Sequence, residues 1–419
     1  MIKYSNRPLL INYTSLLLVQ GGNFIFPLLV FPIIGRNIGV SEFGNILFCY
    51  MVALYFSIFV DYGFNFSAIR TLAKMEHQQS IGQLFYNITF AKLILAIPAL
   101  LTLVLMTLLW EKFNQLSECM FISSLLILAS MLSPYWLFQG RGATATGAMI
   151  TLFSRLSTLL IFLYFPITTT SAALLLTIPS LLAALIMLFL AFKKYPIGMP
   201  TISWSATRSH LKEGRPIFVA NSITMVYSAS NTILLGFIAD PIIAGLYGAA
   251  ERLVRSGLAV IAPLCQAAYP IICNYDKKAQ MAKRHQIIKL ILALSLLFGT
   301  GAFLTVNVFS TQIITLLFGV NFIDAAPMLS VLSIMLLIIP PSMVLAQLYL
   351  LANSHDKILQ RIYVFCSATH CVQIYFMIKF YNALGASYAL ILTELLATIL
   401  IVSLSLKFFK NELQMNFAA

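Results

Sequence analysis

The feature that most constrains this chain is a series of long apolar stretches without charge, which recur about every 30 to 35 residues. Examples run from Leu9 to Gly35, from Cys119 to Gly140 and from Pro216 to Ala239. Most approach or exceed the roughly 20 residues that carry an α-helix across a bilayer core. With 60% hydrophobic and 9% charged residues, the chain has too little polar surface for a soluble globule. Barrel strands would be short and alternating, so the pattern predicts an all-α, multi-pass membrane protein.

We predict twelve transmembrane helices. An A-x-A cleavage site does not follow the N-terminal apolar stretch, which is also too long for a signal peptide, so we expect it to be the first span. The predicted ranges are 9–34, 44–66, 82–110, 118–139, 144–166, 171–193, 216–238, 243–272, 288–308, 326–352, 360–379 and 383–406.

The positive charges predict the orientation of these helices. With the N-terminus inside, most of the 26 Lys and Arg residues fall on or at the edge of cytoplasmic segments. Three others, Arg36, Lys112 and Lys379, fall on the opposite side of the membrane. Because cytoplasmic loops are enriched in Lys and Arg, both termini are expected in the cytoplasm, which requires an even number of spans. The net charge of +13 is accounted for by topology, and nucleic acid is not expected as a partner.

The longest polar stretch predicts a division into two six-helix bundles, 1–193 and 216–419, joined by a cytoplasmic linker at 194–215. A faint repeat supports the division, because Ile33-Ile34-Gly35 with Gly44 recurs as Leu234-Leu235-Gly236 with Gly245. Two halves of this kind, each starting inside, are parallel repeats that enclose a cavity and rock about it.

Four cations fall inside predicted spans: Lys92, Arg155, Arg252 and Arg255. Each costs about 2.5–3.5 kcal/mol at the centre of an isolated helix, so their presence calls for a reason. Two come from each half, which predicts a positively lined cavity that binds an anionic group such as a phosphate or pyrophosphate. The alternative is structural pairing, for example of Arg255 with Glu251 at i, i+4.

Three acids lie in or near spans. Glu394 sits deep in the last helix without a partner within one turn, which makes it the main candidate for ion coupling. Glu251 and Asp61 are candidates for coupling or for charge pairing. For Asp61, pairing with Arg70 at the end of its helix is the simpler expectation.

Pro340 and Pro341 interrupt the tenth span, where they predict a kink and, as an alternative, a hinge.

The sequence lacks the motifs that several kinds of functional site require. There is no G-x-x-x-x-G-K-[ST] loop, the five histidines do not cluster in sequence, and the six cysteines are scattered, so neither a metal site nor a cofactor is expected. Two alternatives stay open beside transport of an anion: a membrane polysaccharide polymerase or ligase, and a drug or metabolite antiporter. The first generally needs a substantial outer catalytic loop, and the second needs an excess of buried acids.

Several segments resemble the O-antigen repeat-unit flippases of the Wzx type, in the polysaccharide transporter family of the multidrug/oligosaccharidyl-lipid/polysaccharide superfamily. They follow the family's order over nearly the whole chain. They are FPIIGRNIGVSEFGNILF at 31–48, DYGFNFSAIRTLA at 61–73, SPYWLFQGRG at 133–142, SNTILLGFI at 230–238, IAGLYGAAERL at 243–253 and LLFGVNFIDAAPMLSVLS at 316–333.

The resemblance implies a MATE-like fold of twelve helices in two bundles that open alternately to cytoplasm and periplasm. It also implies a substrate, an oligosaccharide on undecaprenyl pyrophosphate, which is moved across the inner membrane of a Gram-negative bacterium. Proton or sodium coupling, at Glu394 or Asp61, is part of the same expectation. So are an O-antigen polymerase and a chain-length regulator as partners in lipopolysaccharide biosynthesis.

Overall fold

The computed structural model describes residues 26–73, 80–195, 197–198, 202–238, 240–274, 281–353 and 355–417. Over these ranges the regular elements are all helical and no strand is present, which confirms the predicted fold class. The N-terminal part of the predicted first span, before Phe26, lies outside the described residues. Its remainder forms an apolar helix, Phe26–Ile38.

The helices fall into two compact units. The first unit contains Phe26 and Asn37–Met225, and the second contains Pro27–Arg36 and Val226–Ala419. Each unit therefore takes in a short segment from the other side of the predicted division. One long helix, α11 (Trp204–Ile238), contributes its first part to the first unit and its last part to the second.

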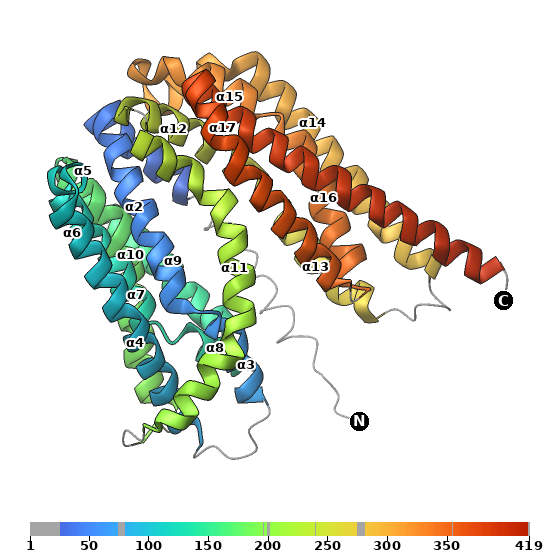
Figure 1. The fold of residues 1–419 in the computed structure, drawn as a ribbon, viewed down its shortest axis with the longest axis horizontal. Helices are drawn as coiled ribbons and strands as arrows, with labels where there is room; N and C mark the ends of the chain where they lie inside the picture. Colours follow the sequence, from blue (N-terminus) through green and yellow to red (C-terminus); the bar gives the residue numbers. More distant parts are fainter. Residues whose placement is uncertain are drawn as a thin grey trace. The chain divides into compact units, whose positions relative to one another are not determined.

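In the first unit, long helices run alongside one another (Figure 1). Helix α10 packs against α7 and α9, and α2 packs against α7 and α4. The elements are α2 (Val40–Asp61), α3 (Phe64–Ala73), α4 (Ser80–Leu109), α5 (Glu111–Gln115), α6 (Ser117–Ser123), α7 (Leu125–Leu132), α8 (Tyr135–Gly140), α9 (Thr144–Phe162) and α10 (Thr169–Lys194).

In the second unit, α14 packs against α16, and α16 packs against α17. Helix α17 contains a break at Asn382, where φ is 50°, and this break separates the last two predicted spans. The elements are α12 (Pro241–Leu258), α13 (Ala262–Asn274), α14 (Met281–Phe318), η1 (Val320–Ala325), α15 (Ala326–Leu332), α16 (Met335–Leu345), the π-helix η2 (Ala346–Leu351) and α17 (Asp356–Phe417).

Seven helices of the described chain are long and apolar enough to cross a membrane, and a bent helix pair adds an eighth. Large apolar side chains such as Leu108, Leu109 and Phe121 are more than two-thirds exposed, as expected of surfaces that face lipid. The chain is a multi-pass membrane protein. Helices also occupy each predicted range from 44–66 onward, so the order of elements is consistent with twelve spans.

The bend in the tenth predicted span does not lie at its prolines. Segments Val320–Leu332 and Met335–Leu351 meet at 44°, and the break between them is at residues 333–334, ahead of Pro340 and Pro341. Pro340 has no backbone N–H, so the carbonyl of Leu336 lacks its usual intrahelical hydrogen-bond donor. That carbonyl lies against Gly299 of α14, so close that a Cβ built on Gly299 would be 2.2 Å from the Leu336 oxygen.

Arg36 helps to hold segment 27–36 against the rest of the second unit. Its guanidinium Nε donates a hydrogen bond of 2.6 Å to the carbonyl of Leu317, and Nη2 donates to the carbonyl of Leu316. These carbonyls belong to the last turn of α14, where no intrahelical N–H is available. A cation here satisfies the helix end and complements its dipole.

The approach of α14 to α16 can be tested with two glycines on the same helix. We expect Gly299→Ala to destabilise the protein by about 1–3 kcal/mol, because its methyl group would strike the Leu336 carbonyl. Gly301→Ala is the matched control, since nothing lies within 4 Å of a Cβ at that position. Thermal unfolding of the purified protein in detergent measures both. Equal melting temperatures for the two variants would contradict the close approach.

Candidate functional site

The first unit contains a cavity of about 430 Å³ lined mainly by α2, α7, α9 and α10. Two of its lining residues are charged, Asp61 and Arg155. The polar residues Ser57, Asn65 and Thr151 also line it. The cavity thus combines a cation and an acid with hydroxyl and amide groups inside a bundle that spans the membrane.

A tight turn places Asp61 within its span. Helix α2 ends at Asp61, and the next two residues, Tyr62 and Gly63, have φ of 47° and 80°. The chain then continues as α3, so that one apolar segment runs from Val40 to Leu72. Glycine is needed at position 63, because a Cβ there would meet the side chain of Ile217 at 2.6 Å. The predicted helix 44–66 is therefore two helices, and Asp61 sits at their junction.

Asp61 pairs with Lys92 rather than with Arg70. The Lys92 Nζ lies 3.0 Å from Asp61 Oδ1 and also donates to the carbonyls of Ser130, at 2.9 Å, and Ser133, at 3.2 Å. Arg70, by contrast, is exposed. The expected Asp61–Arg70 pair is wrong because Lys92 on α4, although far away in sequence, is packed against the end of α2.

The same contacts define what Lys92 can do. An ammonium group has three N–H donors, and these three acceptors account for all of them. The side chain is only 2% exposed, whereas that of Asp61 is 33% exposed and lines the cavity. Lys92 therefore supports Asp61 from behind the cavity wall, as the alternative of structural pairing predicts.

Arg155 faces the cavity from α9. Its guanidinium carbon lies 5.4 Å from the centroid of the Phe26 ring, within the range of a cation–π contact. Since Lys92 and Asp61 already neutralise each other, Arg155 gives the charged groups of this cavity a net value of +1. Such a site favours an anion.

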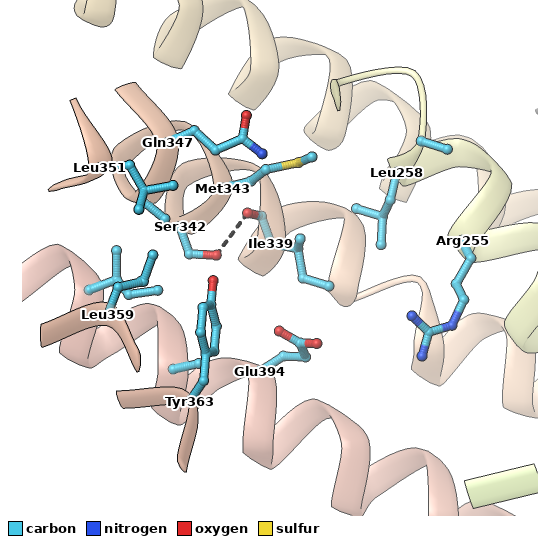
Figure 2. A pocket seen from close by; sticks show the side chains of 14 residues that line it. Arg255, Leu258, Ile339, Ser342, Met343, Gln347, Leu351, Leu359, Tyr363 and Glu394 are labelled. Carbon is cyan, nitrogen blue, oxygen red and sulfur yellow. Dashed lines mark hydrogen bonds between the residues drawn. The ribbon is translucent and has the colours of Figure 1, made fainter. Parts of the chain in front are cut away.

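The second unit contains a comparable cavity of about 460 Å³, lined by α12, α16, η2 and α17. Figure 2 shows Arg255 and Glu394 extending into it from different helices, with the Tyr363 hydroxyl and the Gln347 amide nearby. Glu394 forms no hydrogen bond or salt bridge with the described part of the chain. Glu394 of α17 thus shares a cavity with Arg255 of α12.

Arg255 is paired along its own helix. Its Nη2 lies 2.7 Å from Glu251 Oε1, and its Nε donates to the same oxygen at 2.8 Å. Thr232 of α11 donates to the second oxygen of Glu251 at 3.3 Å. The predicted i, i+4 pair is confirmed. Because the Arg255 side chain is still 37% exposed, against 7% for Glu251, the arginine presents its charge to the cavity.

Arg252 does not line this cavity. Its guanidinium carbon lies 4.3 Å from the centroid of the Phe31 ring. The four predicted cations therefore divide by position. Arg155 and Arg255 each line a cavity, whereas Lys92 and Arg252 are packed beside one.

The second unit contains a buried polar network that was not predicted from the sequence. His370 of α17 is fully buried, with Nδ1 at 2.7 Å from Thr393 Oγ1 and Nε2 at 2.9 Å from Asn231 Oδ1. Asn231 Nδ2 donates to the Tyr247 hydroxyl at 2.7 Å, and Gln373 donates to Thr393. Polar residues at 370 and 373 in an apolar span were the available signal. The network ties α11, α12 and both parts of α17 together beside Glu394.

Comparisons with known proteins cover nearly all of the chain. The family model described as polysaccharide biosynthesis protein matches residues 9–275. A protein of Escherichia coli (strain K12) named "Putative O-antigen transporter" is 28% identical over 405 residues, which cover 96% of each chain. A protein of the same name from Shigella dysenteriae is 26% identical over 394 residues, covering 92% of this chain and 97% of the relative.

Solved structures share the fold at low identity. An inward-facing multidrug resistance MATE family transporter of the MOP superfamily aligns with a TM-score of 0.72 and 13% identity, over 93% of this chain and 96% of its own. The lipid II flippase MurJ in an inward closed conformation aligns with a TM-score of 0.71 and 13% identity, over 98% and 92%. The predicted MATE-like fold is confirmed.

The Lys92–Asp61 pair can be tested by a double-mutant cycle. We expect Asp61→Asn to cost about 3–5 kcal/mol of unfolding free energy, because it leaves the buried Lys92 ammonium without a counter-charge. Lys92→Met should cost less, since Asp61 is one-third exposed to the cavity. The double variant should recover part of the loss. Thermal unfolding in detergent gives all three values, and strictly additive effects would contradict a direct pair.

Proposed function

Because the chain belongs to the polysaccharide biosynthesis protein family, we propose that it is a flippase for undecaprenyl-pyrophosphate-linked O-antigen repeat units. In this proposal the protein moves the lipid-linked oligosaccharide from the cytoplasmic to the periplasmic leaflet of the bacterial inner membrane, with both of its termini in the cytoplasm. The observation that carries it is the presence, inside each membrane-spanning unit, of a cavity lined by a single arginine.

Arginine suits this substrate because its planar guanidinium donates two parallel hydrogen bonds to phosphate oxygens and stays charged at any pH in the cell. Arg155 would hold the pyrophosphate in the first unit, and Arg255 in the second. Lys92, which we also predicted as substrate-binding, would act through Asp61, whose charge it neutralises. Arg252, the other such prediction, would add positive potential beside Arg255. The sugars would occupy the polar parts of the cavities.

Glu394 supplies a route for ion coupling. When Glu394 is ionised, the charges of Arg252, Arg255, Glu251 and Glu394 sum to zero. When it binds a proton, the sum becomes +1, which favours an anion. Proton uptake at Glu394 and pyrophosphate binding near Arg255 would therefore reinforce each other, as thermodynamic linkage requires. Asp61 has its counter-charge fixed by Lys92 and is the weaker candidate for coupling.

Transport by alternating access would proceed as the cavities open first to one leaflet and then to the other. The named relatives are transporters, in agreement with the prediction that the chain is a transporter rather than a polymerase or ligase. A drug or metabolite antiporter of the same superfamily is the second candidate. It is disfavoured because the four intramembrane cations outnumber the three acids. Cooperation with an O-antigen polymerase and a chain-length regulator is part of the proposal.

The anion-binding role is tested at Arg155 in cells whose own copy of the gene is deleted. Arg155→Ala should lower surface O-antigen at least tenfold at unchanged protein abundance in the membrane, because the first cavity loses its cation. Arg155→Lys should restore part of it. The matched control is Arg70→Ala, which removes an exposed arginine that does not line the cavity.

The accumulating intermediate separates the candidate functions. A flippase defect traps lipid-linked repeat units on the cytoplasmic leaflet, whereas a polymerase defect leaves single units displayed on the surface. Normal surface O-antigen in a well-folded Arg155→Ala variant would overturn the proposed anion site. A changed drug-susceptibility panel with normal O-antigen would instead favour the antiporter.

The coupling role is tested with Glu394→Gln, which fixes the neutral state of that side chain. We expect the variant to bind the lipid-linked substrate but to lose the dependence of transport on a proton gradient. Glu394→Asp, which keeps the titratable group, is the control. Counterflow and gradient-driven uptake in vesicles measure the two properties. An unchanged response of Glu394→Gln to the gradient would exclude Glu394 as the coupling acid.

A further inference from the structure

A second, smaller cavity of the second unit lies where two membrane spans end. It measures about 160 Å³ and is lined by α14, α16, η2 and α17. His285 lies in the first turn of the span Ala282–Phe318, and Phe409 lies in the last turn of the span Leu384–Lys410. The cavity is therefore at the level where the hydrocarbon core of a bilayer gives way to lipid headgroups. It shares no lining residue with the cavity of Arg255 and Glu394.

Its wall is apolar and aromatic. The His285 ring packs edge-on against Phe409, with 4.6 Å between centroids, and lies 6.5 Å from the Tyr349 ring. Leu292 and Leu345 complete much of the surface. Apolar cavities of about 150 Å³ in proteins stay dry and accept a molecule of the size of benzene. This slot has the volume for a short stretch of a lipid chain.

Ser405 contributes an unsatisfied hydroxyl to the slot. Ser405 is 3% exposed and lines the slot, yet its hydroxyl has no hydrogen-bond partner in the described part of the chain. Ser403, two residues earlier, donates to the carbonyl of Ile399 in the usual way. A buried hydroxyl without a partner is destabilising, because it has lost its hydrogen bonds to water. The slot therefore provides a donor for an acceptor that a ligand would bring.

Positive charge surrounds the slot. Lys289 lines it, Lys283 and Arg284 lie on the same end of α14, and Lys407 and Lys410 lie on the same end of α17. The sequence has no acidic residue at 281–292, and a single one, Glu412, at 395–419. Basic pockets between transmembrane helices at a membrane boundary are suited to anionic lipid headgroups.

We propose that this slot binds an anionic phospholipid with ester-linked chains. Lys289 pairs with the phosphate, the Ser405 hydroxyl donates to the ester carbonyl, and the aromatic wall of His285, Tyr349 and Phe409 holds the first part of the acyl chain. The ester is what selects this class of lipid. An isoprenoid phosphate has no ester carbonyl, so with its phosphate at Lys289 it would bring no second acceptor to the Ser405 hydroxyl.

The experiment uses the full chain in detergent micelles, supplied in turn with phosphatidylglycerol, phosphatidylcholine and a diether analogue of phosphatidylglycerol. Native mass spectrometry counts the lipids retained per protein. We expect phosphatidylglycerol to be retained in preference to both other lipids. Ser405→Ala should reduce its retention about fivefold, as for the loss of one hydrogen bond. Lys289→Glu should abolish the preference over phosphatidylcholine.

The matched control is Lys379→Glu, which reverses an exposed lysine of α17 that does not line the slot. It should leave retention unchanged. Ser405→Leu, which fills the slot, is a second variant that should exclude the lipid. The proposal fails if the wild type retains the three lipids equally, if Lys379→Glu has the effect of Lys289→Glu, or if inorganic phosphate alone displaces the lipid completely. None of these outcomes bears on O-antigen transport, so this proposal and the proposed function fail independently.

Discussion

The cost of placing polar groups in hydrocarbon governs the rest of this structure. A bilayer core offers no water to an unpaired N–H, carbonyl or charge, so each must be satisfied within the protein or face a water-filled cavity. The Lys92 ammonium, held by one carboxylate and two carbonyls, shows the first solution. Arg255 pairs with Glu251 and also lines a cavity, and Arg155 lines the other cavity. The charges that interrupt the apolar pattern are therefore the residues that determine where the cavities can be.

Turns and prolines within the spans are subject to the same constraint, because each frees backbone groups that need new partners. The turn at Tyr62 and Gly63 sets Asp61 at a helix end, where its carboxylate meets Lys92 of α4. Pro340 frees the carbonyl of Leu336, which lies against the bare Cα of Gly299. The absence of a Cβ at position 299 lets the two helices approach closely.

The local sequence pattern predicts the helices well, but it does not predict which side chains of different helices contact one another. Apolar length alone was enough to predict the helical fold and the order of elements, and the i, i+4 spacing was enough for Glu251 with Arg255. Proximity in sequence favours Arg70 as the ion-pair partner of Asp61. The partner is Lys92, because α4 packs against α2. The His370 network was missed for the same reason. Its members come from α11, α12 and α17, and no local spacing relates Asn231 to His370.

The pairing of Arg255 bears on how an anion would be bound and released. An unpaired arginine in hydrocarbon would hold a pyrophosphate too tightly to release it, because a low dielectric strengthens every ion pair. Glu251 keeps Arg255 satisfied when no ligand is present, through two contacts to one carboxylate oxygen. In the proposed function, a ligand would exchange one partner of Arg255 for another instead of filling a void. With Glu394 across the cavity, the balance between the two partners would depend on a single further charge. Such an arrangement would permit both capture and release, which a transporter needs and which a permanent binding site does not.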